Sequence, residues 1–134
     1  MKITGIDHLV LRTTQTQIMV DFYCQVLSCV VERQLAPDVG LTQLRAGSAL
    51  IDIVAVDSEL GRLGGRASSG RDNNLDHFCL GFTEMSLSDL LVHLTKHNVR
   101  MGEVATRYGA QGFGQSVYIF DPDGNTVELK LEVS

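Results

Sequence analysis

The sequence predicts an α+β fold made of two βαβββ modules in one chain, and two observations lead to this prediction. The first is a repeated motif, because residues 6–13 (IDHLVLRT) and 75–82 (LDHFCLGF) both place Asp-His before an apolar, strand-like run. The two histidines are 69 positions apart (77 − 8) in a chain of 134 residues. The second is the order of patterns, which in each half gives a strand, a helix and then three strands.

In the first half, residues 3–11 predict a strand and residues 15–27 a helix. Thr14 and Gln17 have the spacing of a capping box, and the apolar residues that follow recur with helical period. Three short strands are then expected at residues 29–35, 41–45 and 49–56. Turn-forming residues separate them, namely Pro37, Asp38, Gly40 and Gly47.

A segment rich in Gly, Ser and Arg, about residues 58–74, is expected to connect module one (about 1–57) to module two (about 75–134). In the second half, a strand is expected at 75–82 and a helix capped by Ser86 and Asp89. Further strands are expected at 99–105, 115–120 and 126–133. The sequence DPDGN (121–125) predicts a tight turn between the last two, and the glycine-rich stretch 107–116 predicts a surface loop.

Composition excludes several classes of function. The net charge of −5 and the absence of a Lys/Arg cluster argue against nucleic-acid binding. No apolar run reaches the roughly 20 residues of a membrane span, and the first residues lack the pattern of a secretory leader. Three cysteines without metal-type spacing predict free thiols in a reducing cytoplasm. Each half is too short to bury a good core alone, so the halves must pack together or against a second chain.

Two carboxylates follow different patterns along their strands. Asp52 shares its strand face with Leu50, Val54 and Val56, and an unpaired charge there is costly, so it needs a partner or a metal ion. Glu128 alternates with apolar neighbours, and by itself this pattern describes a strand with one solvated face and one buried face.

The whole arrangement resembles the vicinal oxygen chelate superfamily, which includes glyoxalase I, fosfomycin- and bleomycin-resistance proteins and extradiol dioxygenases. The resemblance rests on the duplicated pattern, on IDHLVL, LDHFCL and FYCQVL, and most specifically on SVYIFDPDGNTVEL at residues 116–129. It implies curved mixed sheets around a cleft, and a homodimer, which is usual for relatives of this length.

The resemblance also implies a metal site. His8 and His77 match the histidine on the first strand of each module, and Glu128 matches the carboxylate on the last strand of the second. Asp52 stands where the first module usually has Glu or Gln, so it is expected to complete the site or act as base with Glu128. The implied cofactor is a divalent ion such as Ni, Zn, Co, Fe or Mn.

Two more residues are expected to bind substrate. Arg12 lies four positions after His8, where an arginine of glyoxalase I contacts a glutathione carboxylate. Val56, however, stands where that enzyme has asparagine. Only one of the two positions therefore supports a glutathione adduct or other thiol adduct as the substrate. Tyr118, ten positions before Glu128, is expected to hydrogen-bond substrate, and a core role is the alternative.

Three functions follow from the resemblance. The favoured one is a metal-dependent lyase or isomerase of the glyoxalase type, in which the ion stabilises an enediolate-type intermediate of a small substrate with adjacent oxygens. The first alternative is a non-haem iron dioxygenase of the extradiol type, because two histidines and a carboxylate also suit iron. The second is a metal-free small-molecule binding protein of the bleomycin-resistance type.

Overall fold

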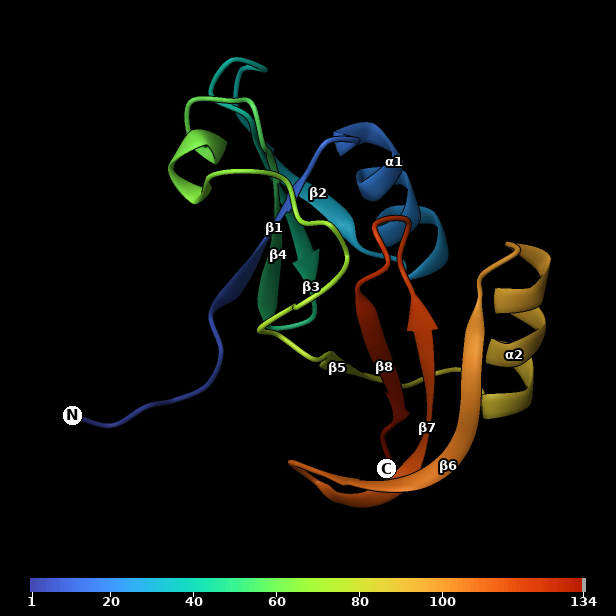
Figure 1. Ribbon diagram of the computed structural model, residues 1–134. Coiled ribbons are helices and arrows are strands. Elements are labelled where there is room, and N and C mark those ends of the chain that lie inside the picture. Colours follow the sequence, from blue (N-terminus) through green and yellow to red (C-terminus); the bar gives the residue numbers. More distant parts are fainter. Residues whose placement is uncertain (134) are drawn as a thin grey trace. The chain divides into compact units, whose positions relative to one another are not determined.

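The computed structural model describes residues 1–133, and its order of elements repeats as the sequence predicts (Figure 1). The chain forms two compact units, one from Met1 to Arg71 (unit 1) and one from Asp72 onward (unit 2). Each unit holds one four-stranded mixed sheet, which confirms the α+β class and the duplicated βαβββ pattern. No helix within residues 1–133 is long and apolar enough to cross a membrane.

Unit 1 contains a sheet with the strand order β1-β4-β3-β2. Its elements are β1 (His8–Thr13), α1 (Thr16–Asp21), η1 (Phe22–Val26), β2 (Val30–Gln34), β3 (Leu41–Ala46), β4 (Ala49–Ala55) and η2 (Gly61–Gly64). Strand β1 pairs with β4 in parallel, and the other pairs are antiparallel. Apolar side chains of the helix and the central strands form its core, including Met19, Tyr23, Leu44, Ile51 and Ile53.

The first helix differs from the prediction in two respects. The helical pattern over residues 15–27 is divided between the α-helix α1 and a π-helical turn, η1. The predicted capping box is wrong, because no side chain caps α1. Instead, the Thr13 hydroxyl accepts a hydrogen bond from the Gln15 amide at 3.0 Å, which orders the turn just before the helix.

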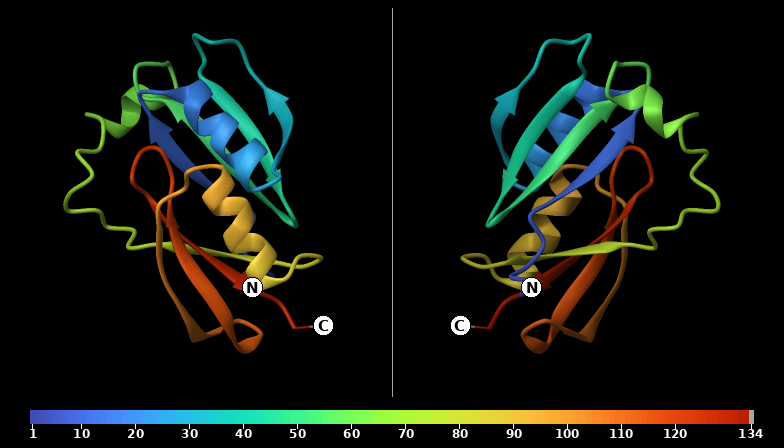
Figure 2. Two further views of the ribbon diagram at one scale, coloured as in Figure 1. Left: turned by 90° about the vertical axis from the view of Figure 1, so that its right-hand side faces the viewer. Right: turned by 90° about the vertical axis from the view of Figure 1, so that its left-hand side faces the viewer.

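Unit 2 repeats this plan with the strand order β5-β8-β7-β6. Its elements are β5 (Phe78–Phe82), α2 (Leu87–Lys96), β6 (Met101–Gly109), β7 (Gly112–Phe120) and β8 (Thr126–Leu131). The predicted cap of α2 is confirmed, since the Ser86 hydroxyl accepts from the Asp89 amide at 3.1 Å. Helix α2 lies against its own sheet (Figure 2) and buries Leu90 and Leu94.

The stretch 107–116 is not the loop that its glycines predict. Strands β6 and β7 pair continuously from Val104 opposite Val117 to Gly109 opposite Gly112, so both arms belong to one long hairpin. Only residues 110 and 111 form the turn, and Gly112 has a φ of 91°, a conformation that favours glycine. The hairpin therefore reaches beyond the strands expected at 99–105 and 115–120.

Strand β8 occupies a central place in the sheet of unit 2. It pairs with β5 in parallel and with β7 in antiparallel orientation. Val127 and Leu129 are buried, as the alternation predicts, but Glu128 and Lys130 on the other face are only 6% and 9% exposed. The expectation of a solvated face on this strand is therefore wrong, and two charged side chains are buried side by side.

Candidate functional site

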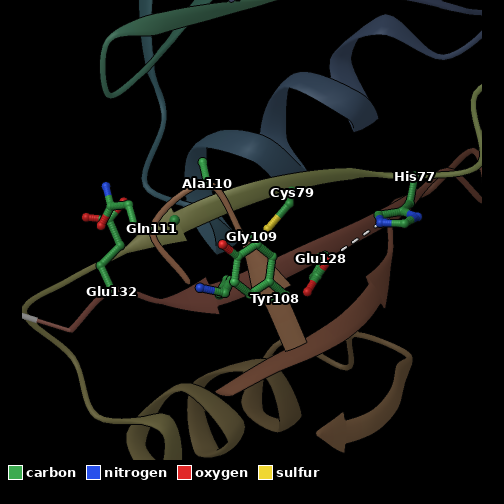
Figure 3. Close-up of a pocket in the computed structure, with 10 residues that line it drawn as sticks. His77, Cys79, Tyr108, Gly109, Ala110, Gln111, Glu128 and Glu132 are labelled. Carbon is green, nitrogen blue, oxygen red and sulfur yellow. Dashed lines mark ion pairs between the residues drawn. The ribbon is translucent and has the colours of Figure 1, made fainter. Parts of the chain in front are cut away.

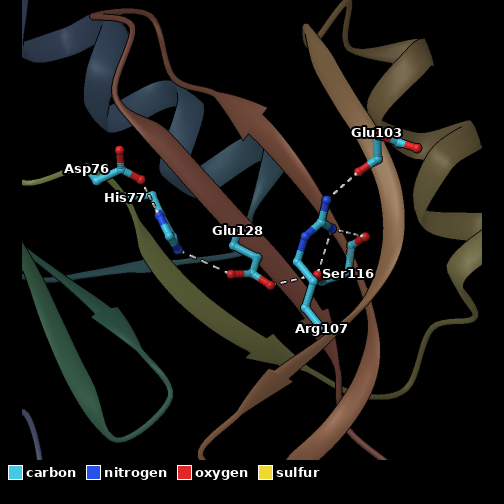
Figure 4. Close-up of polar contacts among 6 residues, drawn as sticks. All are labelled: Asp76, His77, Glu103, Arg107, Ser116 and Glu128. Carbon is cyan, nitrogen blue, oxygen red and sulfur yellow. Dashed lines mark hydrogen bonds and ion pairs between the residues drawn. The ribbon is translucent and has the colours of Figure 1, made fainter.

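The predicted residues His77 and Glu128 lie together in unit 2. His77 immediately precedes β5, and Glu128 lies on β8 opposite Cys79, so parallel pairing brings the two side chains to one face of the sheet. His77 Nε2 is 3.4 Å from Glu128 Oε2, and only 8% of the Glu128 side chain is exposed (Figure 4). The structure thus places an imidazole nitrogen beside a buried carboxylate.

The second oxygen of Glu128 is held by a serine on the neighbouring strand. Ser116 on β7 is fully buried, and its Oγ donates to Glu128 Oε1 at 2.6 Å. The same Oγ accepts from Arg107 Nη1 at 3.0 Å, and Arg107 Nη2 donates to the carbonyl of Glu103 at 3.1 Å (Figure 4). The orientation of Glu128 is therefore fixed through Ser116 by an arginine anchored on β6.

Asp76 supplies a partner for the other nitrogen of His77. His77 Nδ1 is 2.7 Å from Asp76 Oδ2, whose side chain is 94% exposed. When Nδ1 carries the proton, Nε2 presents its lone pair toward Glu128, which is the arrangement that second carboxylates impose on metal-binding histidines. This contact explains the Asp-His motif, because the aspartate orients the histidine that follows it.

The donor pair has the chemistry and spacing that a divalent ion requires. Nitrogen and oxygen ligands about 2.1 Å from a tetrahedral ion lie about 3.4 Å from each other. His77 Nε2 and Glu128 Oε2 are 3.4 Å apart. The residues therefore fit two adjacent positions in the coordination of one ion.

Tyr118 lies beside this pair and not in the open space next to it. Its ring meets the His77 ring edge to face at 5.2 Å, and the Arg107 guanidinium lies 4.3 Å above its ring centre. These contacts hold Tyr118 between the histidine and the arginine. A hydrogen bond from Tyr118 to substrate remains a prediction.

A pocket of about 320 Å³ opens next to Glu128 and lies entirely in unit 2 (Figure 3). This volume is within the range of sites for small ligands. Its walls come from the start of β5, from β8 and its continuation, and from the turn of the β6–β7 hairpin. The lining residues are His77, Cys79, Gly81, Tyr108, Gly109, Ala110, Gln111, Glu128, Lys130 and Glu132.

The Cys79 thiol lines this pocket but is poorly suited to act as a nucleophile. Partial burial, the largest cause, and the negative charge of Glu128 together raise its pKa to about 11, against a smaller lowering by the charge of Lys130. Because only the thiolate attacks or binds metal effectively, Cys79 is almost wholly in its unreactive form near neutral pH.

Unit 1 carries the second predicted histidine, His8, with the same local partner. His8 Nδ1 is 2.6 Å from Asp7 Oδ1. This hydrogen bond is the largest cause of a raised His8 pKa, and the charge of Asp52 adds to it. Asp52 lies opposite Val10 on the adjacent strand, so it shares the sheet face of His8.

Asp52 is buried and finds a neutral partner. It is 4% exposed, and Gln43 Nε2 donates to both of its oxygens at 3.2 Å. Gln43 in turn accepts from Arg33 Nη1 at 3.3 Å. The sequence predicts that this carboxylate needs a partner, and the structure supplies an amide from the neighbouring strand β3.

The guanidinium of Arg12 is engaged by the segment after β4. Its Nε and Nη2 donate to the carbonyl of Gly61 at 3.2 and 3.0 Å, and its Nη1 donates to that of Arg66 at 3.2 Å. Its Nη2 also contacts the carbonyl of Gly65. Arg12 thus fastens η2 and the following residues to β1, and its contact with a substrate carboxylate remains a prediction.

The predicted ligands therefore form two pairs, one in each unit. Within residues 1–133, no group of three His, Cys, Asp or Glu side chains is close enough to hold a metal ion. His77 and Glu128 are in direct contact in unit 2. His8 and Asp52 share one sheet face in unit 1.

Sequence reasoning missed three residues that shape the site. Ser116 and Arg107 lie in the stretch 107–116, whose glycines predict a loop. Nothing in the sequence therefore indicated that the two residues lie on neighbouring strands. Asp76 was not identified as a partner of His77, because adjacent residues of a strand point to opposite faces. The repetition of Asp before each histidine was the signal for its role.

Comparison with solved structures places this architecture among known proteins. An integron cassette protein from the mobile metagenome of V. cholerae is 28% identical, with a TM-score of 0.76, over 99% of this chain and 98% of that chain. A virulence protein from Salmonella typhimurium is 27% identical, with a TM-score of 0.75, over 99% of this chain and 100% of that one.

A lactoylglutathione lyase from Agrobacterium tumefaciens shares the fold at 18% identity and a TM-score of 0.66, over 96% of this chain and 94% of that one. No curated protein matches the chain. The family model described as the Glyoxalase/Bleomycin resistance protein/Dioxygenase superfamily matches residues 5–129, and the chain belongs to this superfamily.

Proposed function

We propose that the protein is a divalent-metal-dependent lyase or isomerase of the glyoxalase type, acting on a small substrate with two adjacent oxygens. The observation that supports it most is the 3.4 Å contact between His77 Nε2 and Glu128 Oε2 at the wall of a pocket. This pair supplies one nitrogen and one oxygen ligand at the separation that two adjacent ligands of one ion have.

In this proposal His77 and Glu128 hold the ion together with His8 and Asp52. Protein sites for divalent ions use three or four ligands, so the pair in unit 2 needs further ligands, and the family resemblance implies His8 and Asp52. When bound, the ion would polarise the adjacent oxygens of the substrate as a Lewis acid and stabilise developing negative charge.

The residues of the chain would carry the proton. Glu128 is the base that takes a proton from one carbon and returns it to the next, because its carboxylate faces the pocket from a buried position. Ser116, which donates to Oε1 at 2.6 Å, holds that carboxylate in one orientation during the transfer. Arg107 keeps the serine in place through its own hydrogen bond to Oγ.

The test is an assay of metal-stripped and metal-restored protein with the hemithioacetal of methylglyoxal and glutathione, the substrate class suggested by the lactoylglutathione lyase of similar fold. We expect turnover that disappears with chelator, returns with a divalent ion, and is lost in Glu128→Gln. Equal turnover with and without metal would contradict the proposal. Oxygen uptake with a catechol, supported by iron alone, would indicate the dioxygenase instead.

The pocket itself favours a second candidate, a binding protein that needs no metal. A volume of about 320 Å³ lined by aromatic, apolar and charged groups can hold a small molecule by direct contacts alone. Saturable ligand binding that is unaffected by chelator, without turnover, would support this candidate. The homodimer and the cytoplasmic location stay predictions, and light scattering tests the first.

A further inference from the structure

The pocket beside Glu128 contains a buried lysine whose charge has no partner. Lys130 on β8 is 9% exposed and lines the pocket. No hydrogen bond or ion pair to its ammonium exists within residues 1–133. Every fully buried side-chain nitrogen and oxygen in this part of the chain has a partner, so the ammonium must reach the open space of the pocket.

The surroundings of Lys130 are built to make room for its side chain. Directly opposite it on β5 stands Gly81, and opposite it on β7 stands the small Ser116. A Cβ on Gly109 would come within 3.3 Å of Lys130 Cδ and Cε, and one on Gly114 within 3.1 Å of Nζ. Glycines of the β6–β7 hairpin thus form a channel that directs the lysine into the pocket.

The nearby carboxylates do not neutralise this charge. Glu128 uses Oε1 for Ser116 and directs Oε2 at His77. Glu132 folds over Gly81, where its Oε1 would lie 2.2 Å from an added Cβ, and it forms no ion pair with Lys130. The stem of Lys130 is buried, and its ammonium faces the pocket without a counter-ion among residues 1–133, so it is available to an anion from outside the chain.

We propose that Lys130 binds an anionic group of the ligand, a carboxylate or a phosphate, in this pocket. Lys130 and Glu128 are two residues apart on one strand face, so their backbone positions lie about 7 Å apart along β8, and both side chains line the same pocket. The ligand is therefore a short acid whose charged end is separated from its reacting carbons by a few bonds. This inference rests on the proposed function only for the reaction, because binding of the anion needs no metal ion.

The experiment uses the full chain, stripped of metal and labelled with ¹³C at lysine, of which there are three: Lys2, Lys96 and Lys130. Inorganic phosphate and pyruvate are the probes, titrated against chloride at constant ionic strength. We expect the Lys130 Cε signal to move and saturate with a Kd on the order of 1 mM. The exposed Lys2 and Lys96 serve as internal controls, and their signals should stay in place because the ionic strength is constant.

Thermal unfolding with the same anions gives a second measurement. The anions should raise the midpoint of the wild type and of the control Lys96→Met more than that of Lys130→Met, since salts such as phosphate also stabilise proteins without binding. Without added anion, Lys130→Met should melt at or above the wild-type midpoint, because an unpaired charge is replaced by an apolar side chain of similar shape.

Two results would overturn the inference. One is a Lys130 signal that follows those of Lys2 and Lys96. The other is a Lys130→Met protein that keeps the whole anion-dependent gain in midpoint. The variant His77→Ala separates this inference from the proposed function, because it should lose metal binding and keep the response of Lys130. A protein that binds no metal but shows the Lys130 response would retain the anion site and refute the metal enzyme.

Discussion

Replacing Ser116 by alanine tests whether Glu128 is held in place as the structure indicates. Ser116 Oγ donates to Glu128 Oε1 at 2.6 Å, and both side chains are buried. A hydrogen bond to a charged group is worth about 1.5–3 kcal/mol, and its removal leaves one carboxylate oxygen buried without a donor. We therefore expect Ser116→Ala to lower the free energy of unfolding by about 2 kcal/mol, and the melting midpoint by roughly 5–8 °C.

Chemical denaturation of four proteins measures this: wild type, Ser116→Ala, Glu128→Gln and the double variant. The double-mutant cycle isolates the part of the hydrogen bond that depends on the charge of Glu128, which we expect to be about 1–2 kcal/mol. Thr83→Ala, at an exposed position just after β5, is the control and should change stability by less than about 0.5 kcal/mol. A coupling energy near zero, with Ser116→Ala as stable as the control, would refute this description of the site.

Three further predictions concern other parts of the chain. Arg12→Ala should expose the segment after β4 to trypsin, with cleavage after residues 62 and 66 appearing first by mass spectrometry, because the carbonyls that Arg12 holds are released; an unchanged digest would contradict this. Cys79, with a pKa of about 11, should react with iodoacetamide at pH 8 about 100-fold more slowly than a thiol of pKa 9.0; reaction at the rate of a free thiol would refute the shift. NMR titration of the metal-free protein should give His8 a pKa above 6.5, and this pKa should fall in Asp7→Asn. Because the folded-state pKa is raised, the contact between protonated His8 and Asp7 stabilises the fold below pH 6.5. This stabilisation disappears as the pH rises through the folded-state pKa.

The repeated pattern allowed the sheets and helices to be predicted because their periods of apolar residues are unambiguous. The sequence of β8 alternates between polar and apolar residues, β4 is a short apolar run, and Ser86 with Asp89 has the spacing typical of a helix start. The division of the first helix into α1 and η1 could not be predicted from the sequence, because an α-helix and a π-helical turn bury nearly the same stripe of side chains.

The β6–β7 hairpin shows why local propensity failed. Gly109, Gly112 and Gly114 lower the strand propensity of this stretch, and by local rules they indicate a loop. In the structure Gly109 and Gly114 lie against the side chain of Lys130, which a Cβ at either position would crowd. The glycines serve a contact between strands that are distant in sequence, and no local pattern reports such a contact.

The candidate site was partly predictable for the same reason. His77 and Glu128 were identified through the family resemblance, and the structure brings them to 3.4 Å. Ser116 was not identified, because its role depends on register between β7 and β8. Lys130 was read as part of a solvated face, since alternation reports which residues share a face but not whether that face is covered.

The most direct test of the central claim is the metal content of untagged protein purified without chelators. Elemental analysis should find about one divalent ion per chain in the wild type and in His97→Ala, a surface histidine on the end of α2. The same analysis should find a large loss in His77→Ala and in Glu128→Gln. A wild-type protein that contains no divalent ion and takes up none when Ni²⁺, Zn²⁺, Co²⁺, Mn²⁺ or Fe²⁺ is added would contradict the account.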